Sequence, residues 1–462
     1  MDVNELALAV PLLLSAVLGT VTVLYVAGAV WFVTGMRPRS GTATLQPNVS
    51  VVVAARDEED TIQRCLRALL AQDYPLKRFE IIVVDDGSTD RTAARIRAMA
   101  SEPVRLLSTT AACGHSGSKK AALTLGIEAA RGDIILTTDA DCLVPPSWIT
   151  GMVRYFETDV GLVIGFSRID LIASEARAPG GQLDDGAGPE PERAPAAQLD
   201  DAAGAAHVGG FAGRPAGHPV MSGARWPTER SDGAGRAGSR RDWRQEYEAT
   251  DFLILMGCIA GSTGHGHSMA ASGQNLAYRK TVFEQVGGYT GLMHRASGDD
   301  VLLMQRVRRQ PGWRIVFAAS PGTHVLHPPA GSIRAFLRQR CRWASNAPCQ
   351  LSMDPWFFAY MLNTYVLNGL LVLSPLLVAG GLLPVSGMLA GWLGKILAEG
   401  AVFARARRLF GGRALRRSFV LWTLLQPLQV LYVGAVGCAG VFTWKGQAHR
   451  WGRRVERSGN VR

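Results

Sequence analysis

The chain has 462 residues and a formal net charge of +11, a length sufficient for a sizeable core and more than one structural unit. Much of its Lys and Arg lies beside apolar stretches, at 37–39, 404–417 and 445–457. This distribution indicates cytoplasmic flanks of membrane helices or contact with anionic lipid headgroups, and argues against nucleic acid as a partner. Seven scattered cysteines without a Cys-x-x-Cys pair indicate neither a disulfide framework nor a zinc site.

An uncharged apolar run occupies residues 6–33 and is long enough to cross a bilayer. The chain begins Met-Asp-Val-Asn-Glu, without the basic segment of a signal peptide, so we expect residues 1–36 to form an uncleaved membrane anchor. Arg37 and Arg39 follow at once. They predict that the next domain, at 45–347, lies in the cytoplasm.

Strand and helix patterns then alternate from 48 to about 166, which is typical of an α/β fold with a mainly parallel sheet. The predicted strands are 48–55, 79–87, 104–108, 134–142 and 160–169. The predicted helices between them are 58–72, 89–100 and 118–130. Farther on, the patterns predict a capped helix at 297–310, a strand at 313–319 and a basic helix at 332–346.

Residues 172–242 interrupt this pattern with Ala, Gly, Pro, Asp and Arg and almost no aliphatic periodicity. Such a segment cannot bury enough apolar surface to offset the entropy of ordering it. We expect a disordered insertion in a surface loop, with a functional lid as the alternative.

Apolar segments at 356–383, 385–403 and 419–443 predict C-terminal membrane helices within 354–444, followed by a basic tail at 445–462. If all three segments span the membrane, the basic tail ends outside, against the positive-inside rule. Either one segment lies in the interface or re-enters, or the tail breaks the rule. We favour a cytoplasmic tail.

Two carboxylates, Asp139 and Asp141, stand at the end of the apolar strand predicted at 134–142. The carboxyl edge of a parallel sheet is where open α/β folds bind ligands. Residues i and i+2 of an extended chain point the same way, so both carboxylates can approach one Mg²⁺ or Mn²⁺ ion that bridges a diphosphate. The alternative is a pair of solvated loop carboxylates.

Asp85 and Asp86 end the second strand, where a nucleotide base and ribose would lie. A helix-capping turn is the alternative for this pair. Glu58 follows the first strand, where it can accept hydrogen bonds from a base or simply open a helix. Lys119, with Lys120 after it, begins a helix at the same edge and can reach phosphate oxygens, or can be solvated.

The acids Asp299 and Asp300 precede a helix far along the chain. One of them can act as a general base, which must lie within hydrogen-bond reach of the attacking hydroxyl, or one can cap the helix. The segment Gln339-Arg340-Cys341-Arg342-Trp343 can bind a diphosphate and stack on a sugar ring, or can anchor an interfacial helix.

The motifs VVVAARDEE, VVDDGSTD, SKKAAL, TDADC, SGDDVLL and QRCRW follow an anchor in this order and precede C-terminal membrane helices. This arrangement resembles the membrane-integrated family 2 glycosyltransferases. Those include processive synthases of cellulose, hyaluronan and poly-N-acetylglucosamine, and relatives that glycosylate lipids. The resemblance covers about 45–346 apart from the insertion. It implies a GT-A fold, a Rossmann-like domain that binds a nucleoside diphosphate sugar, usually UDP-linked.

The resemblance also implies a role for each matching residue. The positions that contact the nucleotide match Glu58, Asp85 and Asp86, and the lysine that faces the phosphates matches Lys119. The pair of acids that holds the metal and diphosphate matches Asp139 and Asp141, and the base that deprotonates the acceptor matches Asp300. The motif that closes over the donor and positions the acceptor falls on Gln339, Arg342 and Trp343. Two departures are Asp57, where the family usually has Asn, and the insertion, which has no counterpart.

The implied enzyme is an inverting, metal-dependent hexosyltransferase of the inner membrane. It would move a sugar to a hydroxyl of a lipid or growing glycan, and the short C-terminal membrane region slightly favours a lipid or a short chain. A processive polysaccharide synthase is the alternative within this class. A non-catalytic membrane scaffold that binds a nucleotide sugar is the alternative outside it.

Overall fold

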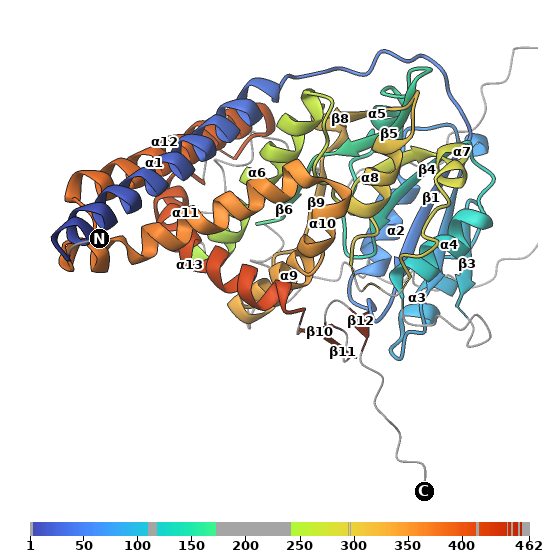
Figure 1. Cartoon of the computed structure of the whole chain (residues 1–462). Helices are drawn as coiled ribbons and strands as arrows, with labels where there is room; N and C mark the ends of the chain where they lie inside the picture. Colours follow the sequence, from blue (N-terminus) through green and yellow to red (C-terminus); the bar gives the residue numbers. More distant parts are fainter. Residues whose placement is uncertain are drawn as a thin grey trace, which may run out of the picture.

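The computed structural model describes residues 3–109, 118–171, 242–293, 295, 297–412, 415–440, 442–444, 447–450 and 453–454 (Figure 1). The insertion predicted at 172–242 lies outside the described residues except for Asp242. Most of the basic tail predicted at 445–462 also lies outside them.

Seven strands form one sheet, in which β7 runs antiparallel to both of its neighbours and the remaining pairs are parallel. In spatial order the strands are β3 (Val104–Ser108), β2 (Phe79–Asp85), β1 (Val49–Ala55), β4 (Ile134–Asp139), β7 (Leu276–Arg279), β5 (Val160–Gly165) and β8 (Arg314–Ala318). Two short strands, β6 (Ser167–Ile169) and β9 (Val325–His327), pair beside it. The predicted mixed, mainly parallel sheet is confirmed.

Helices cover both faces of this sheet (Figure 1). Val51 and Val53 of β1 pack with Leu66 of α2 on one face, whereas Val52 packs with Ala122 of α4 on the other. Burial on both faces explains why the strands are continuous aliphatic runs. The helices of this part are α2 (Ile62–Leu70), α3 (Thr92–Arg97), α4 (Lys119–Glu128), α5 (Trp148–Val153), α7 (Lys280–Gln285), α8 (Val301–Arg309), α9 (Ile333–Ala344) and α10 (Ala347–Met353), with 3₁₀ turns at Leu76–Arg78 and Pro321–Thr323.

Helices α2 and α3 are among those that are shorter than their sequence patterns predict. α2 begins at Ile62 instead of 58, and α3 covers Thr92–Arg97 instead of 89–100. The residues before each helix are used in contacts between the two loops, because Asp90 accepts hydrogen bonds from the backbone amides of both Glu59 and Thr92.

Four helices of the described chain are long and apolar enough to cross a membrane: α1 (Val3–Gly35), α11 (Pro355–Ala379), α12 (Val385–Phe410) and α13 (Arg416–Cys438). Figure 1 shows α1, α11 and α12 side by side, projecting from one end of the α/β part. Apolar side chains such as Leu12, Leu376 and Leu393 are exposed on them. Exposed apolar surface of this extent indicates contact with lipid, so the chain is a membrane protein.

The helix α6 (Trp243–Gly264) connects the membrane helices to the sheet, packing on α1, α12 and α13 as well as on β6 and β8. A Cβ atom on Gly261 would lie 2.2 Å from the carbonyl oxygen of Phe32, and one on Gly35 would lie 2.0 Å from the carbonyl oxygen of Gly261. No side chain fits there, so α1 and α6 meet backbone to backbone.

Both ends of α13 lie against the α/β part. Near its start, Ser418 shares a 2.7 Å hydrogen bond with Thr250 of α6, and near its end Gly437 touches Cys341 of α9. The strands β10 (Phe442–Trp444), β11 (Gln447–Arg450) and β12 (Arg453–Arg454) follow, with β10 beside α9.

Candidate active site

The carboxyl ends of β2, β1 and β4 form one edge of the sheet. Asp85, the last residue of β2, pairs in register with Ala55 of β1, and Asp139, the last residue of β4, pairs with Ala54. The two acids therefore stand at the same edge with only β1 between them. This is the edge at which parallel sheets bind ligands.

The loops after β1 and β2 are tied together. Asp57 accepts a 2.8 Å hydrogen bond from the amide of Thr89, and its own amide donates to the Ser88 hydroxyl. Asp57 has a φ of 51°, a left-handed conformation that Asn and Asp adopt more readily than other non-glycine residues. The departure from Asn at this position therefore keeps the loop geometry.

Three of the predicted nucleotide contacts lie in or beside these loops. Asp85 accepts a hydrogen bond from the amide of Ser88, as the capping-turn alternative requires. Asp86 is buried and accepts a 3.1 Å hydrogen bond from Thr109. Glu58 accepts one from Thr61, and its charge acts on Asp141. The capping turn accounts for Asp85, but it does not account for Asp86 and Glu58 at the same edge of the sheet.

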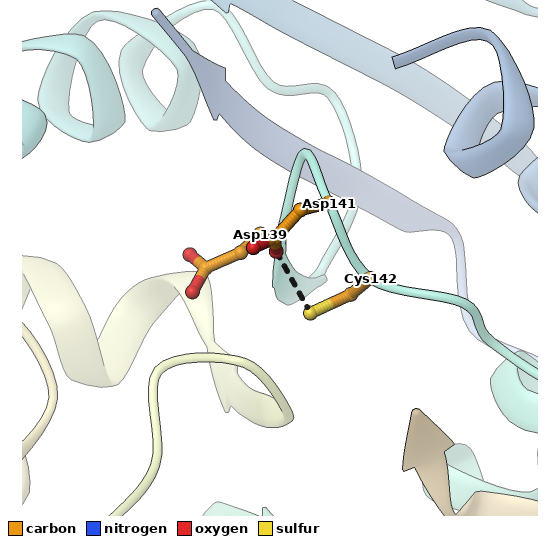
Figure 2. Close-up of side chains that lie close together, drawn as sticks. All are labelled: Asp139, Asp141 and Cys142. Carbon is orange, nitrogen blue, oxygen red and sulfur yellow. Dashed lines mark hydrogen bonds between the residues drawn. The ribbon is translucent and has the colours of Figure 1, made fainter. Parts of the chain in front are cut away.

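Asp139, Asp141 and Cys142 place one potential ligand atom each within 4.8 Å of one another. The strand ends at Asp139, so the alternation argument for Asp139 and Asp141 is wrong: a turn, instead of an extended chain, brings Asp141 back. Figure 2 shows the Asp141 carboxylate facing the Cys142 thiol at 3.4 Å, with the Asp139 carboxylate directed to the other side.

The chemistry of this group fits a hard divalent cation. Burial, with the charges of Asp139 and Glu58, raises the pKa of Asp141 to about 7, so the site is short of positive charge. Burial also raises the pKa of the Cys142 thiol well above its ordinary value, which keeps the sulfur protonated. A thiolate would bind soft metals, whereas two carboxylates beside a neutral thiol suit Mg²⁺ or Mn²⁺.

Lys119 connects the central strand to the distant acidic pair. Its Nζ lies 2.6 Å from Asp139 Oδ1 and 3.1 Å from Asp299 Oδ2. Burial raises the pKa of Asp299, but the attraction of Lys119 and Lys120 outweighs burial and leaves it below its ordinary value. Lys119 therefore joins acids that stand 160 residues apart in the chain.

Asp300 closes the same cluster. A Cβ on Gly273 would lie 3.3 Å from Asp299 Oδ2 and 3.5 Å from both Asp300 Oδ2 and Lys119 Nζ, so these three groups converge on one glycine. Asp300 caps α8 by accepting from the amide of Val301, and it also accepts from the amide of Gly273. Asp300 therefore caps α8 and also lies beside Asp299 and Lys119.

The motif on α9 is placed residue by residue. The guanidinium of Arg342 interacts electrostatically with Asp139, Asp299 and Asp300, so it faces the acidic cluster. Gln339 accepts a 2.9 Å hydrogen bond from Arg340, and the ring of Trp343 lies 4.3 Å from the Arg340 guanidinium.

The structural roles of Lys120 and Arg340 were not predicted from the sequence. Lys120 does not face the edge as a solvated or phosphate-binding lysine would. It is buried and donates to the carbonyls of Arg295 and Ser297, which holds the loop before Asp299. Arg340 is buried in an ion pair with Asp251 of α6 at 2.8 Å. The signal that could have indicated this pair is Asp251 standing directly before the apolar run at 252–256.

Family models match most of the described chain. The model "Glycosyl transferase family 2" matches residues 50–184, and "Glycosyl transferase family group 2" matches residues 234–435. The first includes Glu58, Asp85 and Asp139, and the second includes Asp300 and the motif on α9.

Curated relatives match over shorter stretches. A β-monoglucosyldiacylglycerol synthase from Synechocystis sp. is 37% identical over 110 residues, 24% of this chain and 23% of that protein. An undecaprenyl-phosphate 4-deoxy-4-formamido-L-arabinose transferase from Pectobacterium carotovorum is 36% identical over 109 residues, 23% of this chain and 33% of that protein. The chain thus spans a quarter to a third of the length of these relatives.

A solved structure resembles almost the whole chain. It is the mannosyltransferase PcManGT from Pyrobaculum calidifontis in complex with GDP-Man and Mn²⁺, matched with a TM-score of 0.52 and 17% identity over 93% of this chain and 98% of that chain. At this identity the likeness concerns the fold, and it extends over both the α/β part and the long helices.

Proposed function

The chain belongs to glycosyl transferase family 2, and on that premise we propose that it is an inverting hexosyltransferase. It moves a sugar from a nucleoside diphosphate sugar, UDP-linked, to a hydroxyl of a lipid or growing glycan. The observation that carries this proposal is the convergence of Asp139, Lys119, Asp299 and Asp300 at one edge of the sheet. A donor diphosphate and a base for the acceptor need to be held side by side there.

The residues divide the work by chemistry. Glu58, Asp85 and Asp86 receive the nucleoside, because they line the loops at the carboxyl ends of β1 and β2. Lys119 and Arg342 face the diphosphate as cations. Asp300 accepts the proton of the attacking hydroxyl as that oxygen bonds to the anomeric carbon and the diphosphate leaves with its electron pair. Gln339 and Trp343 position the acceptor.

Asp139 and Asp141 would hold Mg²⁺ or Mn²⁺. When bound, the ion stabilises the negative charge that develops on the leaving diphosphate. The presence of Mn²⁺ with GDP-Man in the similar mannosyltransferase supports this assignment.

Removal of divalent cations is expected to abolish transfer, since Lys119 and Arg342 alone leave the diphosphate charge only partly balanced. Release of nucleoside diphosphate by the purified chain is measured after EDTA treatment and after adding back Mg²⁺, Mn²⁺ or Ca²⁺. Mg²⁺ or Mn²⁺ should restore the rate. Full activity in excess EDTA would remove the metal from the proposal.

The rate of transfer is expected to fall on the acid side of about pH 6. Burial and the charge of Asp299 raise the pKa of Asp300 to about 6. Only the carboxylate form accepts a proton, so below this pKa the rate should drop about tenfold per pH unit and above it reach a plateau. Initial rates at saturating donor between pH 4.5 and 8.5 test this, and a flat profile would contradict it.

We place the protein in the inner membrane with its α/β part in the cytoplasm. The four apolar helices and the arginines at 37 and 39, just after α1, support this orientation. The relatives named for a diacylglycerol and for undecaprenyl phosphate support a lipid acceptor. A processive polysaccharide synthase remains the alternative, and sizing the product formed from radiolabelled donor separates a single addition from a polymer.

The decisive experiment is a panel of UDP- and GDP-linked sugars tested with the purified full chain for release of nucleoside diphosphate. One donor should be turned over in a metal-dependent manner and more rapidly when membrane lipid is supplied. If donors bind and none is ever cleaved, the protein is a nucleotide-sugar-binding scaffold.

A further inference from the structure

A cavity of ≈ 330 Å³ lies far from the acidic cluster, where α1, α6 and α12 end against β8. β8 is the edge strand of the sheet, and β7 and β5 separate it from β4 with its Asp139. Two of the candidate membrane spans, α1 and α12, terminate at this cavity. It therefore lies at the level where the apolar helices give way to the α/β part.

Most of the residues that line the cavity are apolar, although polar and apolar atoms contribute almost equally to its surface. Met36 follows α1, Ile315 and Phe317 come from β8, and Leu409 and Phe410 come from the end of α12. The ring of Phe410 is fixed by stacking on Phe166 at 4.2 Å. A cavity of this size and lining is within the range of small-molecule sites and favours an aliphatic occupant.

One polar atom beside the cavity makes no hydrogen bond to the described residues. The hydroxyl of Thr263 is buried, with 5% of the residue exposed, and makes no hydrogen bond to the described residues. The neighbouring hydroxyl of Ser262 already donates to the carbonyl of Ile259. The oxygen itself has less than 1 Å² of accessible surface, so Thr263 offers no polar contact to an occupant of the cavity.

Positive charge lies on one side of the cavity. Arg37 and Arg39 line it and are exposed. Arg405 donates twice to the carbonyl of Met36, which adds a third cation nearby. The charges of Glu157 and Asp159 act on Arg39, but both acids are already paired with Arg314. An aliphatic chain in the cavity and an anion at its mouth would together match this site.

We propose that the cavity binds an anionic phospholipid, with one acyl chain against Phe317 and Leu409 and the phosphate group on Arg37 and Arg39. This inference requires only that the protein lies in a membrane and does not depend on the transfer chemistry. Such a lipid would fill the junction between the anchor and the sheet and stabilise it.

The test is native mass spectrometry of the full chain supplied with equal amounts of phosphatidylglycerol and phosphatidylcholine. The wild type should retain one phosphatidylglycerol in preference to phosphatidylcholine. Arg37→Gln with Arg39→Gln should reduce this preference by roughly tenfold to thirtyfold, since each cation near a membrane surface contributes to anion binding. The matched control, Arg67→Gln with Arg97→Gln on α2 and α3, removes the same charge from another surface and should keep the preference.

Two cavity variants test the chain-binding part. Thr263→Phe fills the cavity and should abolish retention of either lipid. Thr263→Val replaces the hydroxyl by a methyl group of similar size and, as the matched control, should keep the retention and the fold measured by circular dichroism. An excess of inorganic phosphate or glycerol phosphate should not displace the lipid. Equal retention of both lipids by the wild type, an unchanged preference in the double arginine variant, or displacement by free phosphate would each overturn the proposal.

Discussion

Replacing Asp300 by asparagine is expected to lower the rate of sugar transfer by about two to four orders of magnitude while donor binding stays within a few-fold of the wild type. Asn has nearly the same shape and is as good a helix cap as Asp. It can still accept from the amide of Val301 or of Gly273. What it cannot do is accept a proton from the acceptor hydroxyl.

This substitution therefore separates the two roles that Asp300 has in the structure. If the residue only caps α8, Asp300→Asn is nearly silent; if it is the base, transfer is lost. Turnover is measured with the preferred donor, and donor affinity by calorimetry. Glu128→Gln, an exposed acid on α4, serves as the matched control and should keep full activity. Near-normal turnover in Asp300→Asn would remove this residue from the base role.

The second large effect is expected at Asp251. Its carboxylate pairs with Arg340 of α9 at 2.8 Å and also accepts hydrogen bonds from Trp422 and Gln429 of α13. The side chains of Asp251 and Arg340 are only 12% and 7% exposed. Removing one partner of a buried pair leaves the other charge uncompensated, so Asp251→Ala should cost about 3–5 kcal/mol in free energy of unfolding.

Denaturant unfolding of the full chain in detergent measures this cost. Asp159→Ala breaks an exposed pair with Arg314 and should cost at most about 1 kcal/mol. The double variant Asp251→Leu, Arg340→Met replaces both charges by apolar groups and should recover most of the loss. If Asp251→Ala is no more destabilising than Asp159→Ala, the pair does not hold α9 to α6.

The pair also affects the motif on α9, because the guanidinium of Arg340 lies 4.3 Å from the Trp343 ring and donates to Gln339. Two residues proposed to position the acceptor are thus oriented by an arginine that reaches into the membrane-proximal helices. The double variant, although stable, should therefore turn over more slowly than the wild type.

The strands could be predicted from the sequence because their signal is local. Aliphatic runs bounded by Gly, Asp and Ser located β1, β2, β3 and β4 to within a few residues, and the alternation of strand and helix gave the mainly parallel sheet. The same logic placed Asp85 and Asp139 at one edge. These predictions are possible because both faces of the sheet are buried, so the strands are nearly continuous apolar runs.

Contacts between distant segments could not be predicted in this way. Lys119 bridges Asp139 and Asp299, a contact that the sequence does not indicate, and Lys120 next to it is buried in a loop contact. Neighbouring lysines look alike in sequence, and only the packing of α4 decides which one faces the acids. The Asp251–Arg340 pair joins residues 89 positions apart, and no periodic pattern in the sequence indicates it.

The backbone contact between α1 and α6 at Gly35 and Gly261 fixes the position of the α/β part relative to the membrane helices. The chain from 36 to 48 is long enough to let a tethered domain swing above the bilayer, but α6 is held against the anchor and, through Asp251, holds α9 in turn. If the apolar helices span the bilayer as proposed, the acidic cluster therefore stands at a constant height above the lipid surface. Under the proposed function, an acceptor would be selected by how far its hydroxyl projects from the membrane as well as by its chemical identity.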